Sequence, residues 1–109
     1  MKLETYTHGK YQIVRIQDEK SRINDLSELR DLVTGYLDRG KNYIAISFCD
    51  ASYIYSGAIA VLIGCHQLIQ NSGGSLCIIE PNPELFDILE TLNIDRVINI
   101  YVSEEYLPD

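Results

Sequence analysis

Apolar and polar residues follow one another along this chain in runs that predict strands separated by helices. Five short runs rich in β-branched and aromatic residues predict strands, at Leu3–Thr7, Tyr11–Ile16, Tyr43–Phe48, Leu76–Ile79 and Val97–Val102. Only the turn residues 8–10 separate the first two runs, so we expect these to form a hairpin.

Three longer segments carry apolar residues at helical spacing. In the first, from Leu26 to Leu37, Asp25 is the expected N-cap and Glu28 completes a capping box. Gly40 follows the last periodic residue and is expected to end the helix, because glycine readily adopts the left-handed conformation found there.

The second helix is expected to run from Ser56 to about Asn71 and to end at the pair Gly73-Gly74. The third is expected to start at Asn82-Pro83, where a capping residue precedes a proline that suits the first helical position. A short acidic turn is expected after the last strand.

The element order ββαβαβαβ predicts an α/β fold. Alternating strands and helices favour a mixed β-sheet whose parallel neighbours are joined by right-handed crossovers, with the helices packed on the sheet. A length of 109 residues suits a single domain over residues 1–109. In such folds ligand and partner sites gather at the carboxyl ends of the strands.

Charge and hydropathy narrow the function classes. Nine Lys and Arg residues stand against sixteen Asp and Glu, a formal net charge of −7, and the basic residues are dispersed. A phosphate backbone would be repelled, so we expect no nucleic-acid partner. The first residues lack an apolar signal core and no apolar run approaches the ~18 residues of a membrane span. We therefore expect a cytoplasmic protein with no direct membrane insertion.

The cysteines predict buried thiols rather than chemistry. Cys49, Cys65 and Cys77 are odd in number and lie within apolar runs. Together with the two histidines they lack the spacing of zinc ligands, so we expect no metal and no cofactor.

The stretch DASYIYSGAIAVLIGC, residues 50–65, places a serine where a strand ends and an apolar helix begins. That helix has almost no polar face, which predicts packing on nearly all sides. Ser56 has two interpretations. It is either a plain N-cap contributing ~1 kcal/mol, or a hydroxyl at a helix N-terminus that favours a phosphate by ~0.3 to 1 kcal/mol. Tyr53 and Tyr55 form either an aromatic binding patch or half-buried packing.

This stretch resembles the signature of the STAS domain, the family of bacterial anti-sigma factor antagonists, usually Asp-Leu-Ser-x-x-Asp-Ser-Ser/Thr-Gly-Leu-Gly-x-Leu-x-x. Asp50 and Ser52 match its first and third positions, and Ser56 falls on the phosphorylatable serine. Tyr55 stands where the family has an acidic residue, and Gly57 where it has Ser or Thr. Three downstream segments are also similar to the family, at residues 73–76, 81–85 and 92–98.

The resemblance implies a function without catalysis. Such an antagonist binds an anti-sigma factor that is also a serine kinase, is inactivated when the kinase phosphorylates it, and is restored by a metal-dependent serine phosphatase. Ser56 would be the switch. The implied partner-binding residues are Asp50, Ser52, Tyr53, Tyr55 and Gly57, with a second patch at Glu19, Lys20, Ser21 and Arg22.

Two alternatives remain open. In the first, the chain is a STAS module without a switch, such as the small STAS subunit of a bacterial lipid-asymmetry ABC transporter. Tyr55 in place of an acidic residue would support this alternative. In the second, the chain is an enzyme or small-ligand binder that uses the helix N-terminus at Ser56 for an anionic ligand, although no base or metal site is evident.

Overall fold

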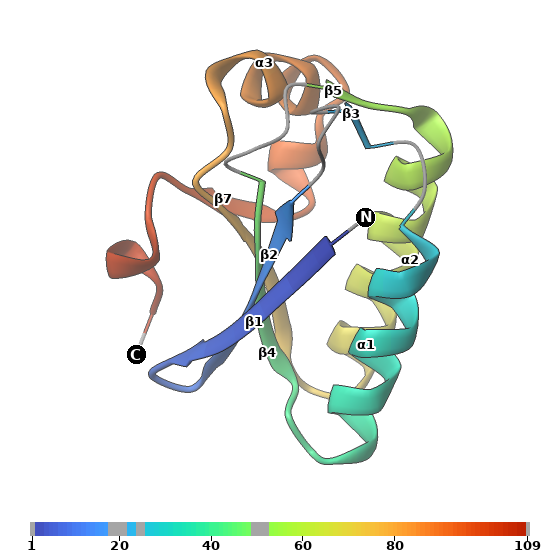
Figure 1. Cartoon of the computed structure of the whole chain (residues 1–109), viewed down its shortest axis with the longest axis vertical. Helices are drawn as coiled ribbons and strands as arrows, with labels where there is room; N and C mark the ends of the chain where they lie inside the picture. Colours follow the sequence, from blue (N-terminus) through green and yellow to red (C-terminus); the bar gives the residue numbers. More distant parts are fainter. Residues whose placement is uncertain (1, 18–21, 24–25, 49–52, 109) are drawn as a thin grey trace.

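A computed structural model describes residues 2–17, 22–23, 26–48 and 53–108 (Figure 1). A five-stranded sheet has the order β1-β2-β4-β6-β7. Its strands are β1 (Lys2–His8), β2 (Tyr11–Gln17), β4 (Tyr43–Ser47), β6 (Ser75–Ile79) and β7 (Asn99–Tyr101). The hairpin partners β1 and β2 are antiparallel, whereas β2, β4, β6 and β7 pair in parallel. The expected mixed α/β sheet is confirmed.

The helices are α1 (Ser27–Asp38), α2 (Ser56–Asn71) and α3 (Pro83–Thr91), with short 3-10 turns η1 (Ile94–Arg96) and η2 (Glu104–Tyr106). Two further strands, β3 (Arg22–Ile23) and β5 (Tyr53–Ile54), pair in parallel as a separate small sheet. Neither was predicted. The last strand begins at Asn99 rather than Val97, because residues 97 and 98 complete the turn that follows η1.

The expected glycine end of α1 is confirmed, but its start differs. Gly40 has φ +76, its N–H donates to Leu37 O at 3.0 Å, and the N–H of Lys41 donates to Tyr36 O at 2.9 Å. These two bonds satisfy the last carbonyls of the helix. At the other end Leu26 holds the N-cap position without a side-chain bond. The predicted cap, Asp25, lies outside the described residues.

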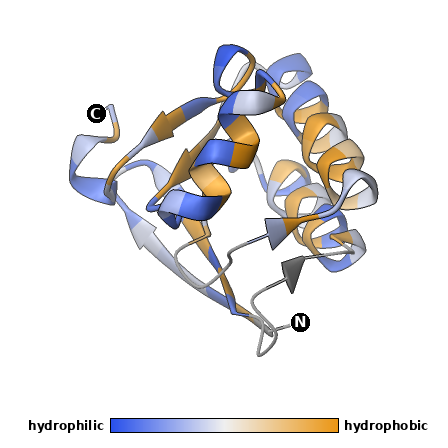
Figure 2. Ribbon diagram, turned by 90° about the horizontal axis from the view of Figure 1, so that it is seen from above, coloured by the Kyte–Doolittle hydropathy of each residue, from blue (hydrophilic) through white to orange (hydrophobic). Residues whose placement is uncertain are grey.

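One face of the sheet carries the larger core. Helices α1 and α2 lie side by side on this face, and hydrophobic residues make up the central strands (Figures 1 and 2). α2 contributes the fully buried residues Ala58, Leu62, Cys65 and Ile69. Leu68 on the same helix is 39% exposed, so packing on nearly all sides, as predicted for α2, is wrong.

The other face of the sheet carries a smaller apolar cluster under the C-terminal segment. Tyr11, Ile13 and Cys77 are buried there together with Leu107. The hydroxyl of Tyr6 on β1 donates a hydrogen bond of 2.8 Å to Glu104 Oε2. Burial, aided by this bond to a carboxylate, raises the pKa of Tyr6 to about 12. The C-terminal segment is thus fastened to the N-terminal hairpin.

Two of the three cysteines are described, and both are buried as predicted. Burial raises the pKa of the Cys65 thiol, so its reactive thiolate form is suppressed. Cys49 lies outside the described residues.

Gly74 lies where two backbone segments approach each other closely. A Cβ at this position would lie 1.7 Å from the carbonyl oxygen of Asn42, just before β4. We therefore expect Gly74→Ala to lower the free energy of unfolding by at least ~2 kcal/mol, as measured by urea denaturation. The control is Gly35→Ala in α1, which meets nothing within 4 Å and should gain ~0.5 to 1 kcal/mol. Equal effects of the two substitutions would contradict the close approach.

Candidate partner-binding site

Ser56 is the first residue of α2 and is exposed. Tyr55 holds the N-cap position with φ −84 and ψ 158, and its carbonyl accepts the N–H of Ile59 at 3.1 Å. Among the described residues, no side chain caps this helix end. The interpretation of Ser56 as a plain N-cap is therefore wrong: the backbone of Tyr55 opens the helix, and the serine hydroxyl follows it.

The electrostatics at this end of α2 favour an anion. The first turn contains no acidic side chain, and the positive end of the helix dipole and the first N–H groups lie here. α1 and α3 differ, since Glu28 and Glu84 already stand in their first turns. A phosphate on Ser56 would thus meet a favourable field from its own helix, worth ~0.3 to 1 kcal/mol.

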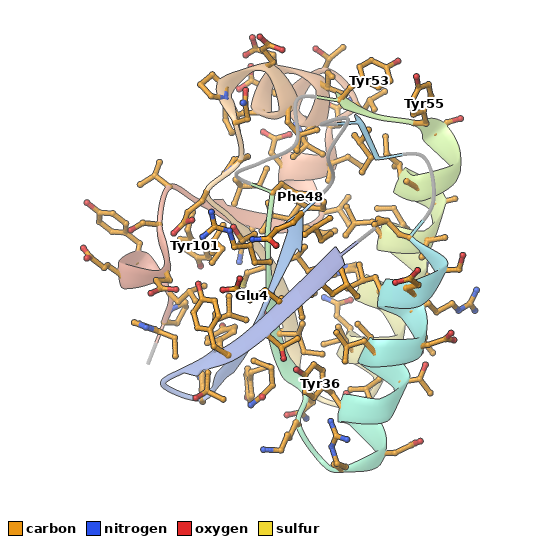
Figure 3. The ribbon with its side chains drawn as sticks, in the orientation of Figure 1. Glu4, Tyr36, Phe48, Tyr53, Tyr55 and Tyr101 are labelled. Carbon is orange, nitrogen blue, oxygen red and sulfur yellow. The ribbon has the colours of Figure 1, made fainter. Side chains whose placement is uncertain are left out.

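The two tyrosines before Ser56 form a pair on the surface. Their rings meet edge to face, with centroids 4.8 Å apart and an interplanar angle of 66°. Tyr53 is 43% exposed and Tyr55 40%, so packing against each other still leaves much of both rings open (Figure 3). Such a pair offers a large apolar surface with a polar rim, which suits a protein interface.

The small sheet joins both predicted patches. β3 runs parallel to β5, with Arg22 opposite Tyr53 and Ile23 opposite Ile54. The backbone at Arg22, in the second predicted patch, therefore lies beside the segment that leads into Ser56. Gly57 is exposed next to Ser56. The remaining predicted residues lie outside the described part of the chain: Glu19, Lys20, Ser21, Asp50 and Ser52.

An open groove of about 390 Å³ runs from Ser56 to α3, which packs against β5. One part of its lining comes from β5 and the first turn of α2: Tyr53, Ile54, Ser56 and Ile59. The other part comes from the end of α3: Asp87, Ile88, Thr91 and Leu92. The contribution of α3 was not predicted, because helical periodicity does not show which apolar residues stay exposed, as Leu92 does.

Neither a metal site nor a membrane-spanning helix occurs among the described residues. There, no cluster of three or more His, Cys, Asp or Glu side chains is placed to hold a metal ion. Within the same residues, no helix has the length and apolar character needed to cross a membrane.

Comparison with known proteins gives relatives of one kind. Over 66 residues the chain is 30% identical to a Thermotoga maritima protein provisionally described as an anti-sigma factor antagonist. This match covers 61% of the chain and 58% of that relative's length. The sequence profile of the STAS domain family matches residues 2–107.

Solved structures that share the fold include the following two. An anti-sigma factor antagonist (STAS) domain protein from Planctomyces limnophilus has a TM-score of 0.80 at 12% identity, with 94% of this chain and 92% of that chain covered. The phosphorylated form of the Bacillus cell fate determinant SpoIIAA has a TM-score of 0.70 at 12% identity, over 95% and 94% of the two chains. The fold is that of the anti-sigma factor antagonists.

The family follows from the profile match over almost the whole chain. This protein belongs to the STAS domain family. The resemblance noted in the sequence is thereby confirmed.

Stability measurements on two alanine variants test the assignment of the helix starts. Ser56→Ala should change the free energy of unfolding by less than ~0.5 kcal/mol, because no side chain caps α2. Asn82→Ala should cost ~1 kcal/mol, because Asn82 Oδ1 accepts the N–H of Glu84 at 3.0 Å. Urea denaturation of both variants gives the comparison. A loss for Ser56→Ala as large as that for Asn82→Ala would restore the capping role.

Proposed function

We propose that this chain is an anti-sigma factor antagonist that binds an anti-sigma factor with serine-kinase activity, and that phosphorylation of Ser56 ends the binding. One observation carries the proposal: Ser56 is an exposed first residue of α2, and no side chain in the described part of the chain caps this helix. The hydroxyl is thus accessible to a kinase and has no capping role to lose.

The relatives support this direction. The Thermotoga maritima relative is provisionally described as an antagonist of an anti-sigma factor. The Bacillus protein SpoIIAA, which shares the fold, has been solved in both phosphorylated and unphosphorylated forms. A fold that accommodates a phosphate in one protein is a suitable scaffold for the same switch here.

The switch has a physical basis in the difference between the free and the bound protein. In the free chain, a phosphate at the start of α2 remains hydrated and is favoured by the helix dipole. In the complex the same dianion would be desolvated within an interface, at a cost of several kcal/mol unless the partner supplies matched cations. One modification therefore costs the free state little and the bound state much.

The proposed contact surface surrounds Ser56. Tyr53, Tyr55 and Gly57 form its described part, and the strand pairing of β3 with β5 brings the backbone at Arg22 beside it. We include the other predicted residues in the same surface: Glu19, Lys20, Ser21, Asp50 and Ser52.

On this proposal the chain performs no catalysis itself. The partner kinase transfers the phosphate, and a metal-dependent serine phosphatase removes it. We place this cycle in the cytoplasm. The alternative of a STAS subunit without a switch is not favoured by the relatives, and co-purification with an ABC ATPase would be its signature.

Intact-mass spectrometry tests the switch directly. The protein is incubated with ATP and each serine-kinase anti-sigma factor of its own host. We expect a gain of one phosphate that is absent in Ser56→Ala. Ser27→Ala is the matched control, because Ser27 is likewise an exposed first residue of a helix. Phosphate that persists in Ser56→Ala, or no phosphate with any of these kinases, would contradict the assignment.

A binding measurement tests the consequence of the modification. Ser56→Asp places a negative charge in the position of the phosphate, so we expect its affinity for the partner to fall about tenfold or more, ~1.4 kcal/mol. Ser56→Ala should bind like the native protein, because it removes only a hydroxyl. Isothermal titration calorimetry gives both constants. Unchanged affinity of Ser56→Asp would show that charge at this site does not gate the partner.

A further inference from the structure

We infer that the groove between the first turn of α2 and the end of α3, which we call the α2–α3 groove, seats an amphipathic helix of the partner whose apolar face is flanked by Lys or Arg. This inference rests on the proposed function in one respect, namely that Ser56 lines the groove. The shape, the lining and the charge of the groove each favour this occupant.

The lining supplies apolar anchors at both ends. Ile54 and Ile59 belong to the Ser56 side of the groove, and Ile88 and Leu92 to the α3 side. Leu92 is 50% exposed although it follows directly on α3, and Tyr53 is 43% exposed beside it in the lining. Two large, exposed apolar side chains that line one groove can contact apolar side chains of a partner.

The shape suits a helix better than a small ligand. A volume of about 390 Å³ is near the lower limit of ordinary ligand pockets, roughly 300 to 1,000 Å³. The groove is open rather than enclosed, so it would leave much of a small molecule in water. Apolar side chains spaced three or four residues apart on one helix face enter such a groove from above.

Charge selects the kind of helix. Asp87 is the one charged residue of the described lining, and it is exposed. The other charged side chains of α3, Glu84 and Glu90, are also acidic and exposed, so this helix presents carboxylates alone. An acidic occupant would be repelled, whereas Lys or Arg beside the apolar face would find Asp87 within the groove.

A peptide selection tests the inference without any anti-sigma factor. A displayed library of helical 16-residue peptides is selected on the immobilised native protein. We expect the enriched peptides to carry apolar residues at helical spacing with Lys or Arg beside them. The affinity of a synthetic copy should fall at least about tenfold on Leu92→Glu. The matched control is Leu68→Glu, an exposed leucine on α2 outside the groove, which should bind normally.

Charge reversal tests the choice of occupant. On Asp87→Lys the basic peptide should bind at least about tenfold more weakly, and a version with Glu in place of its Lys or Arg should regain affinity. Urea denaturation confirms that each variant is as stable as Leu68→Glu. Enriched peptides that are acidic, peptides that bind Leu92→Glu unchanged, or no enrichment over the Leu92→Glu protein would each overturn the inference.

Phosphorylation on the same variants separates this inference from the proposed function. Peptide capture without kinase-dependent phosphate at Ser56 would leave the groove assigned and remove the switch. Phosphorylation that proceeds equally on the native protein and on Leu92→Glu, with no peptide captured, would leave the switch and remove the groove.

Discussion

The packing of α2 against the sheet and α1 fixes the position of Ser56, around which the candidate site is built. Ala58, Leu62, Cys65 and Ile69 form the inner stripe of this helix and are completely buried, so the helix can neither rotate nor slide without exposing them. Just after its C-terminal end, Gly74 lies against the backbone of Asn42, and this contact fixes where the helix ends relative to β4. The position of its first residue follows from these contacts, and no capping side chain is required there.

The two ends of α2 therefore differ in kind. The end near Gly74 is closed by backbone bonds, with Gly74 N–H donating to Ile69 O and Gly73 N–H to Gln70 O, both at 3.0 Å. The end at Ser56 presents an exposed hydroxyl, two half-open tyrosine rings and a groove shared with α3. A rigid element that is anchored at one end and open at the other holds a surface in place while leaving it free for a partner.

How far the sequence predicts this molecule depends on how local each signal is. Helical periodicity and the left-handed glycine after α1 act over a few residues, and both were predicted correctly. The span of α2 was also predicted, but its N-cap was not, because an extended residue of any type can open a helix through its carbonyl alone, as Tyr55 does. β3 and β5 are too short to show a two-residue period.

The groove joins β5 to the end of α3, and no local pattern encodes which distant segments meet. The hydropathy of α2 indicates how much of it is apolar but not which neighbours cover it, hence the exposed Leu68.

The bond between Tyr6 and Glu104 spans 98 positions of the chain and ties the first strand to the last turn. During synthesis the hairpin of β1 and β2 emerges before residues 104–107, so this bond and the cover that Leu107 provides form only after that later segment has been made. The apolar face under Leu107, with Ile13 and Ile79, is therefore uncovered during synthesis. Until that segment is in place, this face is exposed in the way that makes a nascent chain a substrate for chaperones.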